Sequence, residues 1–539
     1  MSSYYFLKFH QSHLFAIFVG YMKPSLQSGN KINFTSLGCA RNLVDTEVML
    51  GLVLQAGYEV THQIEDADFL VVNTCGFLAS SRQEGLDTIA DLFKNKKRSA
   101  KVIIAGCMVQ KHKEEIKEKF PGIHYYLGSG DMEKILQAVR SPEAGEVVSS
   151  ARSYLEWGEV PRQVSTPKNY AYLKIAEGCA KSCAFCIIPK IKGTLKSKPQ
   201  EQVLKEFHAL LKQGVHEVIL IAQDLGDWGK EGIAKLQFGA KSALFVQDPD
   251  SAQIAYSKSS MTICAETGPA QKSSNLASKA SFATPSKDKP DLESLLREML
   301  KVKGDYWIRL LYLYPDEITD GLIDVIRSDS RLCAYLDMPL QHINDDILKA
   351  MRRKTSKKQI IDILTKLRAQ VPGVMVRTSL MVGFPGETEE QFAELVQFIQ
   401  EHPLDNIGIF KYSREEESLS AKMPGHISEE VKQKRYEKLA VAQLKEVRMR
   451  NRSYIGKKLK VMVEGYHPDS PYLMRGRFYG QCPEIDGQVI INDGRKVKGF
   501  GKMYEVEITQ AADYDLIGRV VGPVSGSTTS KPLALVSHG

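Results

Sequence analysis

Three cysteines with a short, defined spacing, Cys179, Cys183 and Cys186, form a C-x3-C-x2-C run just after a predicted strand at residues 172–176. Three thiolates on one loop can bind a four-iron cluster and leave its fourth iron without a protein ligand. That iron can chelate S-adenosylmethionine, and an electron passed into the sulfonium then releases a 5′-deoxyadenosyl radical. The alternatives are a zinc loop or three unrelated thiols, but zinc would need a fourth nearby ligand that the sequence does not obviously supply. The spacing therefore predicts a radical S-adenosylmethionine enzyme with a [4Fe-4S] cluster.

Three further cysteines, Cys39, Cys75 and Cys107, each follow a short apolar run within a few residues, and each has a glycine beside it. A lone cysteine next to an apolar strand is more often a small buried hydrophobic residue than a ligand. These three, however, occupy corresponding positions at the ends of strands in one predicted parallel sheet, where ligands of open α/β sheets bind. We therefore expect a second cluster site here.

Other candidate residues have two interpretations. The sequence Gly383-Phe384-Pro385-Gly386-Glu387 follows a predicted strand and opens a helix, where backbone amides can meet polar groups of S-adenosylmethionine. A plain strand-to-helix turn with an acid at the helix start explains Gly383, Gly386 and Glu387 equally well. Phe185, beside the third cysteine of the run, packs either on the adenine of the cofactor or in the core.

Several residues receive no functional role from the sequence. His342 and Asp224 end predicted strands and can face the site, but neither suggests a particular chemistry. Cys264, Cys333 and Cys482 lack the strand-end arrangement of the other six cysteines, so we expect them to be structural or incidental.

The elements around the first three cysteines alternate between strand and helix. Such alternation predicts a parallel α/β sheet. The expected strands are residues 31–36, 69–72 and 102–105, and the expected helices are residues 43–56, 83–93 and 114–120.

The central region repeats the same alternation, which predicts a partial (βα)6 TIM-like barrel with its site at the carboxyl ends of the strands. A long helix at residues 430–450 is expected to connect it to the C-terminal region. The expected strands are residues 172–176, 218–222, 308–313, 335–338, 375–382 and 407–412, and the expected helices are residues 202–212, 292–302, 345–367 and 389–400.

Beyond residue 452 the pattern changes to short strands separated by Gly/Pro turns. Five of them predict a small, OB-like β-barrel, a class that commonly binds nucleic acid. Eleven Lys/Arg against nine Asp/Glu between Arg452 and Gly522 give only weak support for phosphate binding. The expected strands are residues 458–464, 473–478, 488–491, 503–508 and 516–521.

A chain of 539 residues with 43% hydrophobic and 25% charged residues is expected to form several globular domains. The net charge of +8 fits contact with RNA or a ribosome but demands neither. Residues 14–19 are apolar but too short for export or a membrane span, and nine cysteines without a signal peptide favour a reducing compartment. We expect a cytoplasmic protein with no membrane partner. The expected divisions are an unpatterned extension at 1–30, domains at 31–147, 165–450 and 452–523, a flexible Ser/Lys-rich insertion at about 229–290 and a tail at 524–539.

The motifs together resemble the methylthiotransferase family over about residues 31–225 and 291–523. The resemblance is carried by SLGCARNLVDTE (36–47), VNTCGF (72–77), KIAEGCAKSCAFCIIPKIKG (174–193), RLLYLYP (309–315), YLDMPLQH (335–342), AMRRKT (350–355) and KYSREEES (411–418).

The resemblance implies a three-cysteine α/β domain, a radical S-adenosylmethionine barrel and a C-terminal β-barrel called TRAM. It implies two [4Fe-4S] clusters, one on Cys39, Cys75 and Cys107 and one on the C-x3-C-x2-C cysteines, with S-adenosylmethionine as both radical source and methyl donor. Within the family, the motifs are most similar to the branch that methylthiolates the β-carbon of an aspartate in small-subunit ribosomal protein twelve. The partners implied are that protein or the assembling small subunit, with an electron donor and a sulfur source of unknown identity.

Two other functions stay open at this point. A tRNA adenosine methylthiotransferase of the same family would share both clusters and the fold, although LYLYP, MPLQH and the nearly balanced charge of the last domain argue against it. A non-catalytic iron–sulfur RNA-binding protein would be favoured by a missing cluster cysteine, and all six are present.

Overall fold

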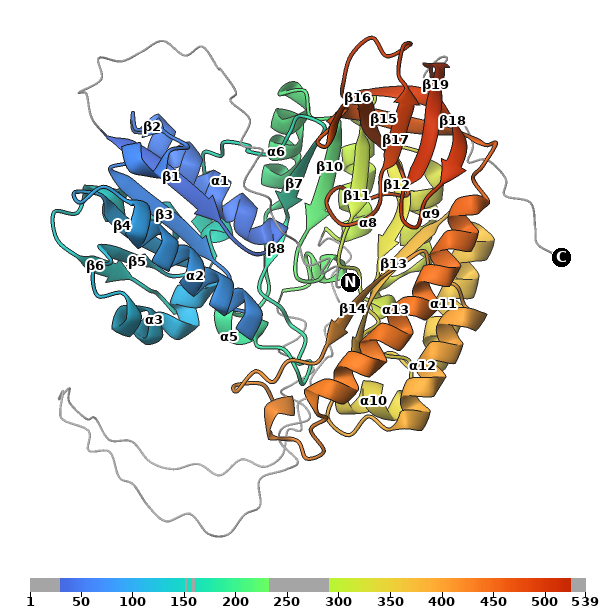
Figure 1. Cartoon of the computed structure of the whole chain (residues 1–539), viewed down its shortest axis with the longest axis horizontal. Helices are drawn as coiled ribbons and strands as arrows, with labels where there is room; N and C mark the ends of the chain where they lie inside the picture. Colours follow the sequence, from blue (N-terminus) through green and yellow to red (C-terminus); the bar gives the residue numbers. More distant parts are fainter. Residues whose placement is uncertain (1–29, 151–152, 158–159, 232–289, 525–539) are drawn as a thin grey trace, which may run out of the picture.

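The computed structural model describes residues 30–150, 153–157, 160–231 and 290–524. These residues form two parallel sheets and a small closed barrel, which lie side by side in the order of the sequence (Figure 1). The expectations for the N-terminal extension, most of the insertion and the C-terminal tail lie outside the described residues. The described chain leaves the second sheet at Glu231 and returns at Pro290, and the carbonyl of Pro290 touches Gly229, so the two ends of the insertion are neighbours.

The first sheet is parallel throughout, in the order β2-β1-β3-β4-β5-β6. Its central strands are fully covered by helices, so they read as unbroken apolar runs rather than alternating ones. The parallel α/β unit is confirmed, with three strands, β2, β5 and β6, that are too short to show a periodicity. Its elements are β1 (Lys31–Ser36), β2 (Glu59–Val60), β3 (Phe69–Thr74), β4 (Lys101–Gly106), β5 (Tyr125–Leu127), β6 (Gly145–Val147), α1 (Ala40–Gln55), α2 (Ala79–Asn95), α3 (Cys107–Lys119) and α4 (Ile135–Arg140).

The second sheet has six parallel strands in the order β14-β13-β12-β11-β10-β7, with helices on its outer face (Figure 1). Its two edge strands, β7 and β14, do not pair with each other, so this is the expected open barrel. Its elements are β7 (Tyr170–Lys174), β10 (Glu217–Ile221), β11 (Trp307–Leu310), β12 (Leu332–Asp337), β13 (Met375–Val382), β14 (Asn406–Lys411), α6 (Gln200–Lys212), α8 (Leu292–Leu300), α9 (Asp320–Ser328), α11 (Lys357–Gln370), α12 (Glu389–Glu401) and α13 (Glu429–Arg452).

One helix expected in this region is wrong. Residues 345–367 form two helices, α10 (Asp345–Ala350) and α11, separated by a loop in which Arg352 has a φ of 57°. Ser356 accepts a hydrogen bond from the amide of Gln359, and the Gln359 side chain accepts one from the Ser356 amide. This capping box starts a new helix where the apolar periodicity alone suggests continuity.

The small β-barrel is closed, in the order β15-β16-β17-β19-β18, as expected. Its apolar interior is continuous with the side chains that fill the open barrel, including Tyr172 and Tyr335. The segment 479–486, between β16 and β17, fits against the amino-terminal ends of the open barrel's strands. There Tyr335 donates a hydrogen bond to Asp486 (2.7 Å), and Tyr170 donates one to Glu484. The strands are β15 (Lys458–His467), β16 (Ser470–Phe478), β17 (Val489–Asp493), β18 (Lys502–Ala511) and β19 (Leu516–Pro523).

A buried ion pair joins the two barrels. Glu217 on β10 accepts hydrogen bonds from Arg309 on β11 (2.5 Å) and from Arg477 on β16 (2.7 Å), and all three side chains are buried. Because each charge has a partner, the contact between the barrels leaves no isolated ion in a low-dielectric core. Cys333 and Cys482 are also buried at this contact, where the sequence suggests a structural role.

No helix within the described ranges is long and apolar enough to span a bilayer.

Candidate cluster site

The C-x3-C-x2-C loop leaves the open barrel after β7 and a short strand, β8 (Ala176–Glu177), which pairs with β9 (Lys196–Ser197). Gly178 has a φ of 75°, and a Cβ there would lie 2.2 Å from the carbonyl oxygen of Thr194, so the loop can turn this tightly only at a glycine. The Cys179 amide donates to the Gly193 carbonyl at 3.2 Å. These contacts fix the start of the loop over the carboxyl ends of the barrel strands.

Backbone amides in this loop point at the cysteine sulfurs. The Lys181 amide donates to Cys179 Sγ and the Ile188 amide donates to Cys186 Sγ, each at 3.4 Å. Burial raises the pKa of Cys179 to about 12 and that of Cys186 to about 11, although these amides oppose the shift. Three gathered thiols with N–H donors aimed at sulfur are the donor set that an iron–sulfur cluster requires.

The second set of cysteines lies at three neighbouring strand ends. Cys39 follows β1 and precedes α1, Cys75 follows β3, and Cys107 follows β4 and begins α3. A Cβ at Gly38 would lie 2.6 Å from the Cβ of Cys75, and Asn42 contacts Cys107 Sγ through its Oδ1 at 3.7 Å. The structure thus brings the three together, and the donor set again fits an iron–sulfur cluster.

Arg41, in the first turn of α1, extends from the first sheet to the open barrel. Its Nη1 donates a 2.7 Å hydrogen bond to the carbonyl of Ala222, just after β10, and its guanidinium lies 4.9 Å from the ring centre of Tyr312. Burial alone would raise the pKa of Cys39, but the Arg41 charge and two backbone amides outweigh it and lower that pKa. The same guanidinium also favours ionisation of Cys186 in the other set. Arg41 therefore joins the sheet that carries the first three cysteines to the open barrel, and its charge acts on both groups.

Tyr312 has an unusual backbone. Its φ of 65° lies in the left-handed region, which non-glycine residues rarely adopt. The chain leaves the extended conformation there, and β11 ends at Leu310 instead of the expected residue 313. Its amide donates to Asp337 Oδ2 at 3.3 Å, and Asp337 also accepts a 2.7 Å hydrogen bond from Arg377. Neighbouring buried charges thus hold Tyr312 in this conformation beneath Arg41.

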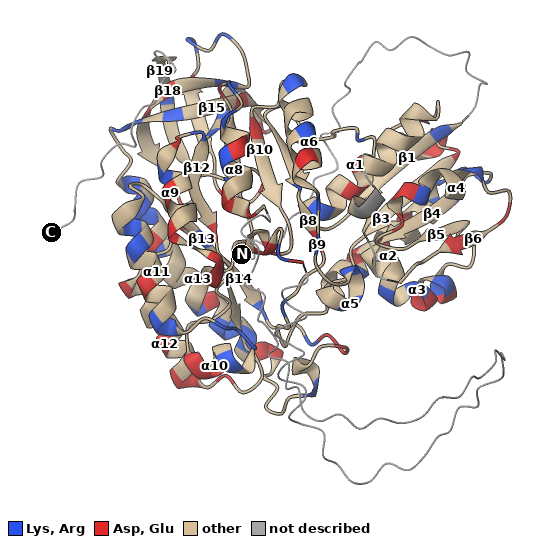
Figure 2. Ribbon diagram, turned by 180° about the vertical axis from the view of Figure 1, so that it is seen from behind, with Lys and Arg blue, Asp and Glu red and all other residues tan. Residues whose placement is uncertain are grey.

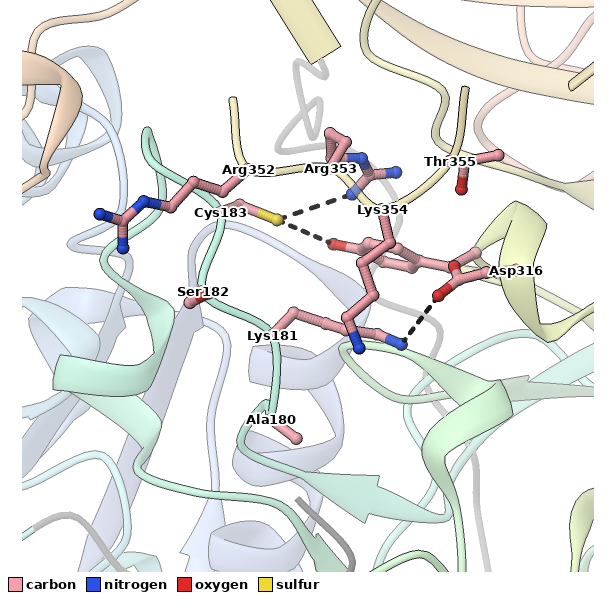
Figure 3. A pocket seen from close by; sticks show the side chains of 10 residues that line it. Ala180, Lys181, Ser182, Cys183, Asp316, Arg352, Arg353, Lys354 and Thr355 are labelled. Atoms are coloured by element: carbon pink, nitrogen blue, oxygen red, sulfur yellow. Dashed lines mark hydrogen bonds and ion pairs between the residues drawn. The ribbon is translucent and has the colours of Figure 1, made fainter. Parts of the chain in front are cut away.

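A pocket opens beside Cys183, lined by basic residues from the loop between α10 and α11 (Figure 3). Arg353 contacts Cys183 Sγ at 3.6 Å and stacks 4.0 Å from the ring centre of Tyr314, whose hydroxyl lies 3.8 Å from the same sulfur. Arg352 and Lys354, on either side of Arg353, are exposed. The unexpected break between α10 and α11 is what places these residues at the cysteine loop.

Lys181 is surrounded by carboxylates at the other side of the loop. It lies 2.7 Å from Glu317, 3.2 Å from Asp224 and 3.3 Å from Asp227. Burial, reinforced by the two neighbouring acids, raises the pKa of Asp224 to about 7 although Lys181 opposes the shift. Asp224, which had no role in the sequence, thus helps to hold the cysteine loop through Lys181.

The Gly383–Glu387 turn is fastened to its surroundings. The buried Glu387 carboxylate accepts hydrogen bonds from the Gly383 amide (2.5 Å) and Arg435 (2.7 Å), and it lies 3.1 Å from His342 Nε2. Gly383 and Gly386 have φ values of 77° and 83°. Glu387 therefore shapes the turn through protein contacts, and His342 acquires a partner that sequence reasoning did not give it.

Phe185 is half-buried against Phe384, Tyr412 and Met351. It belongs to the cysteine loop and brings that loop into contact with the apolar cluster that contains Phe384 of the Gly383 turn.

A buried group of charges ties the first sheet to the cysteine loop. Asp45 on α1 forms ion pairs with Lys174 at the end of β7 and with Lys192 on α5 (Ile188–Lys192), the latter at 3.2 Å. Glu177, just before Cys179, pairs with both lysines, at 3.3 Å and 2.7 Å. The four side chains are between 0% and 3% exposed.

Sequence reasoning gave no individual role to Arg41, Tyr312, Lys181 or Arg353, although all four lie in the motifs that carry the family resemblance. A charged residue within two positions of a candidate ligand cysteine is a usable sequence signal for a functional residue. On such a short loop its side chain cannot easily reach solvent, so we expect it to interact with the site. The positive φ of Tyr312 has no signal in the sequence at all.

A three-cysteine parallel sheet beside an open parallel barrel with a C-x3-C-x2-C loop, followed by a small β-barrel, is the architecture of a radical S-adenosylmethionine methylthiotransferase. Family models match in the same order: uncharacterized protein family UPF0004 at residues 31–128, the radical SAM superfamily at 277–399 and the TRAM domain at 455–521.

Curated relatives extend this to the whole chain. The chain is 56% identical over 493 residues to the ribosomal protein uS12 methylthiotransferase RimO of Protochlamydia amoebophila, covering 92% of this chain and 93% of that one. The identity to RimO of Chlamydia abortus is 52% (93% and 97% covered), and to that of Geobacter sulfurreducens 38% (91% and 98%). Among solved structures, the radical S-adenosylmethionine methyltransferase TsrM of Kitasatospora setae aligns with a TM-score of 0.45 and 14% identity, over 72% of this chain and 76% of that one. The chain belongs to the RimO family of methylthiotransferases.

As a family member, the chain is an enzyme that uses [4Fe-4S] clusters and S-adenosylmethionine.

Proposed function

We propose that this enzyme methylthiolates the β-carbon of an aspartate in ribosomal protein uS12, free or in the assembling small subunit. The name of its relatives supports the choice of protein substrate. The observation that carries the proposal is that Arg41, two residues after Cys39, reaches the carbonyl of Ala222 and the ring of Tyr312 on the open barrel, so the strand ends that carry the two groups of three cysteines meet there.

We assign Cys39, Cys75 and Cys107 to one cluster and Cys179, Cys183 and Cys186 to the other. When bound, the barrel cluster and S-adenosylmethionine supply a radical that removes hydrogen from an unactivated C–H bond, while the other cluster supplies a sulfur methylated from a second S-adenosylmethionine. Phe185 offers an apolar face for adenine. The amides of Gly383 and Gly386 already donate to Glu387 and to the Gly425 carbonyl, so we assign this turn a role in shaping the wall of the cofactor site. Glu387 contributes by holding that turn.

The chain's own residues do the remaining work. Arg353 places a positive charge at Cys183, and Lys181, held by its carboxylates, fixes the loop between Cys179 and Cys183. Asp45 and Lys192 hold the two cysteine-bearing units in one arrangement. The proposal needs an electron donor and a sulfur source outside the chain, and it places the reaction in the cytoplasm with no membrane partner. We assign the three units to residues 31–147, 165–450 and 452–523.

The decisive experiment is intact-mass analysis of uS12 from cells with and without the gene, combined with nucleoside analysis of their tRNA. We expect a methylthio-sized mass to disappear from uS12 and the tRNA to be unchanged. Loss of a modified nucleoside with an unchanged uS12 mass would reject the proposal in favour of a tRNA substrate. The helices on the outer face of the open barrel carry no uniformly basic surface for a tRNA backbone: the charged residues of α11 are mainly Lys and Arg, those of α12 are all Glu, and α13 carries both signs (Figure 2).

Cysteine variants test the assignment of the clusters. Cys183→Ala is expected to abolish reductive cleavage of S-adenosylmethionine, because the barrel cluster loses a ligand. Cys39→Ala is expected to preserve cleavage and to abolish methylthiolation. Methylthiolated uS12 from the Cys39 variant would reject the role given to the first three cysteines.

A further inference from the structure

Within the described part of the chain, most buried or half-buried arginines are paired with carboxylates; Arg475 on β16 is not, and neither are two arginines near the cysteines. Burying a guanidinium without an anionic partner is costly, so such pairing is the norm. The paired ones are Arg162 with Glu47, Arg309 and Arg477 with Glu217, Arg377 with Asp337, and Arg435 with Glu387. Within the described part of the chain, neither Arg41 nor Arg353 forms an ion pair with a carboxylate.

Arg41 and Arg353 differ in how many of their N–H donors already have a partner. The Arg353 guanidinium contacts Cys183 Sγ, donates to the Pro339 carbonyl and stacks on Tyr314, so its groups are engaged on several sides. Arg41 donates only Nη1 to a carbonyl, at Ala222, and its remaining interactions are with the ring of Tyr312 and the thiol of Cys39. Arg41 is half-buried, and within the described part of the chain its Nη2 donates no hydrogen bond to a carbonyl or carboxylate, so this end of the fork can take a further acceptor.

The backbone beneath Arg41 is strained in a way that points to function. Tyr312 keeps a φ of 65° because its amide bonds Asp337 and Asp337 is held by Arg377. Strained non-glycine residues persist where the surrounding structure fixes them, and they cluster at binding sites and active sites. Here the strained backbone holds the ring of Tyr312 against one face of the Arg41 guanidinium. The ring thereby fixes the orientation of the guanidinium.

We propose that Arg41 binds the carboxylate of the substrate aspartate and thereby selects aspartate over asparagine. This inference rests on the proposed function. A guanidinium and a carboxylate can form two parallel charge-assisted hydrogen bonds, whereas an amide of the same shape would place its own NH2 donors against the arginine. The β-carbon of aspartate is bonded directly to its carboxylate carbon, so a carboxylate held at Arg41 places the β-hydrogens at the contact between the two cysteine-bearing sheet ends.

The alternative is that Arg41 only offsets the negative charge of the thiolates of Cys39, Cys75 and Cys107. That role predicts an effect on cluster electronics with no effect on the choice between aspartate and asparagine. The two explanations therefore differ in a binding measurement that does not depend on turnover.

The test measures binding of fluorescently labelled recombinant uS12 to the cluster-loaded enzyme by anisotropy. The residue modified in cells, located by mass spectrometry, is either kept as Asp or replaced by Asn. We expect the wild-type enzyme to bind the Asp form about 10-fold or more tightly than the Asn form, as for hydrogen bonds to a charged group. Arg41→Gln is expected to bring this affinity ratio close to one. Arg41→Lys keeps the charge but loses the paired N–H donors of the guanidinium, and it is expected to give an intermediate ratio.

Arg98→Gln is the matched control, because Arg98 is an exposed arginine of the same sheet, before β4 and thus at the end opposite the cysteines. It is expected to keep the wild-type ratio. Iron content and the electron paramagnetic resonance spectra of the reduced enzyme verify that Arg41→Gln retains both clusters. Should Arg41→Gln lose a cluster, Arg41→Lys decides by the same ratio.

The proposal is overturned if a cluster-loaded Arg41 variant discriminates Asp from Asn as the wild type does, and a shifted cluster potential in that variant would establish the charge-offset role. Failure of the proposed function looks different, since wild-type enzyme would then leave uS12 unmodified in cells whatever Arg41 does.

Discussion

Asp45 and Lys192 form an ion pair with 3.2 Å between Oδ2 and Nζ, and neither side chain is more than 3% exposed. Asp45 lies on the helix that follows Cys39, and Lys192 lies on the helix that follows Cys186. Because Lys174 and Glu177 complete the group, the backbone segments carrying the two sets of cysteines are joined by charges that water does not reach. The separation of the two sets is thereby a property of the folded chain.

Replacing Asp45 by Asn is expected to lower the free energy of unfolding by about 3–5 kcal/mol, because two buried lysines would lose an anionic partner. Chemical denaturation of the cluster-free protein measures this. The control is Asp91→Asn, whose exposed pair with Lys94 is expected to contribute less than about 0.5 kcal/mol. An Asp45 variant as stable as the control would show that these charges do not hold the two units together.

Replacing Gly38 by Ala is expected to remove one of the two clusters. A Cβ would lie 2.6 Å from the Cβ of Cys75, and the φ of 88° disfavours alanine. Iron per chain is expected to fall from about eight to about four atoms, with cleavage of S-adenosylmethionine retained. Gly57→Ala is the control because Gly57 has the same φ with open space around it. Equal iron content in the two variants would contradict the crowding argument.

Cys39 is expected to react with iodoacetamide faster than an ordinary thiol in the cluster-free protein, since Arg41 lowers its pKa and the thiolate is the nucleophile. Arg41→Gln leaves burial as the main influence, so the pKa of Cys39 rises and its labelling slows at neutral pH. Peptide mass spectrometry over pH 6–9 measures both rates. An unchanged Cys39 rate in the variant would show that Arg41 does not act on this thiol.

Acid is expected to loosen the contact between the two barrels through Glu217. Burial would raise its pKa, but Arg309 and Arg477 lower it below the ordinary value of 4.5. A carboxyl whose pKa is depressed by folding stabilises the folded state above its unfolded pKa, and this contribution disappears as the pH falls below about 4.5. Thermal melting of the wild type is therefore expected to drop steeply below that pH.

Glu217→Gln is expected to be less stable at neutral pH and to show a shallower decline in acid. Glu118→Gln, which removes an exposed carboxylate on α3, serves as the control and is expected to follow the wild-type curve. Parallel curves for Glu217→Gln and the wild type would locate the acid-sensitive group elsewhere.

The sequence predicts much of the architecture because parallel strands that are covered on both faces are continuous apolar runs. Strand β3 is buried along its whole length, and residues 375–382 are predicted to the residue as β13. The two-residue β2 and three-residue β5 and β6 could not be found in this way, because so few residues show no period. The split of residues 345–367 into two helices depends on the Ser356–Gln359 capping box, a local signal that is weaker than the apolar pattern around it.

The candidate site also has a part that the sequence predicts and a part that it does not. Cysteine spacing and strand ends identify all six expected ligands, since sulfur chemistry restricts which residue types can serve. The roles of Arg41 and Tyr312 depend on contacts between residues far apart in the chain, such as the hydrogen bond from Arg41 to Ala222. Such contacts exist only after the first sheet has docked on the open barrel, and no local pattern encodes them.

The segment 479–486 covers the amino-terminal end of the open barrel. Tyr335 and Tyr170 of the barrel donate hydrogen bonds to Asp486 and Glu484 of this segment. The carboxyl ends of the same strands carry the cysteine loop, so the contacts of this segment and the candidate site lie at opposite ends of the open barrel. In parallel barrels the amino-terminal end serves stability and the carboxyl end serves chemistry, and the C-terminal domain thus supports the barrel from the end that takes no part in the reaction.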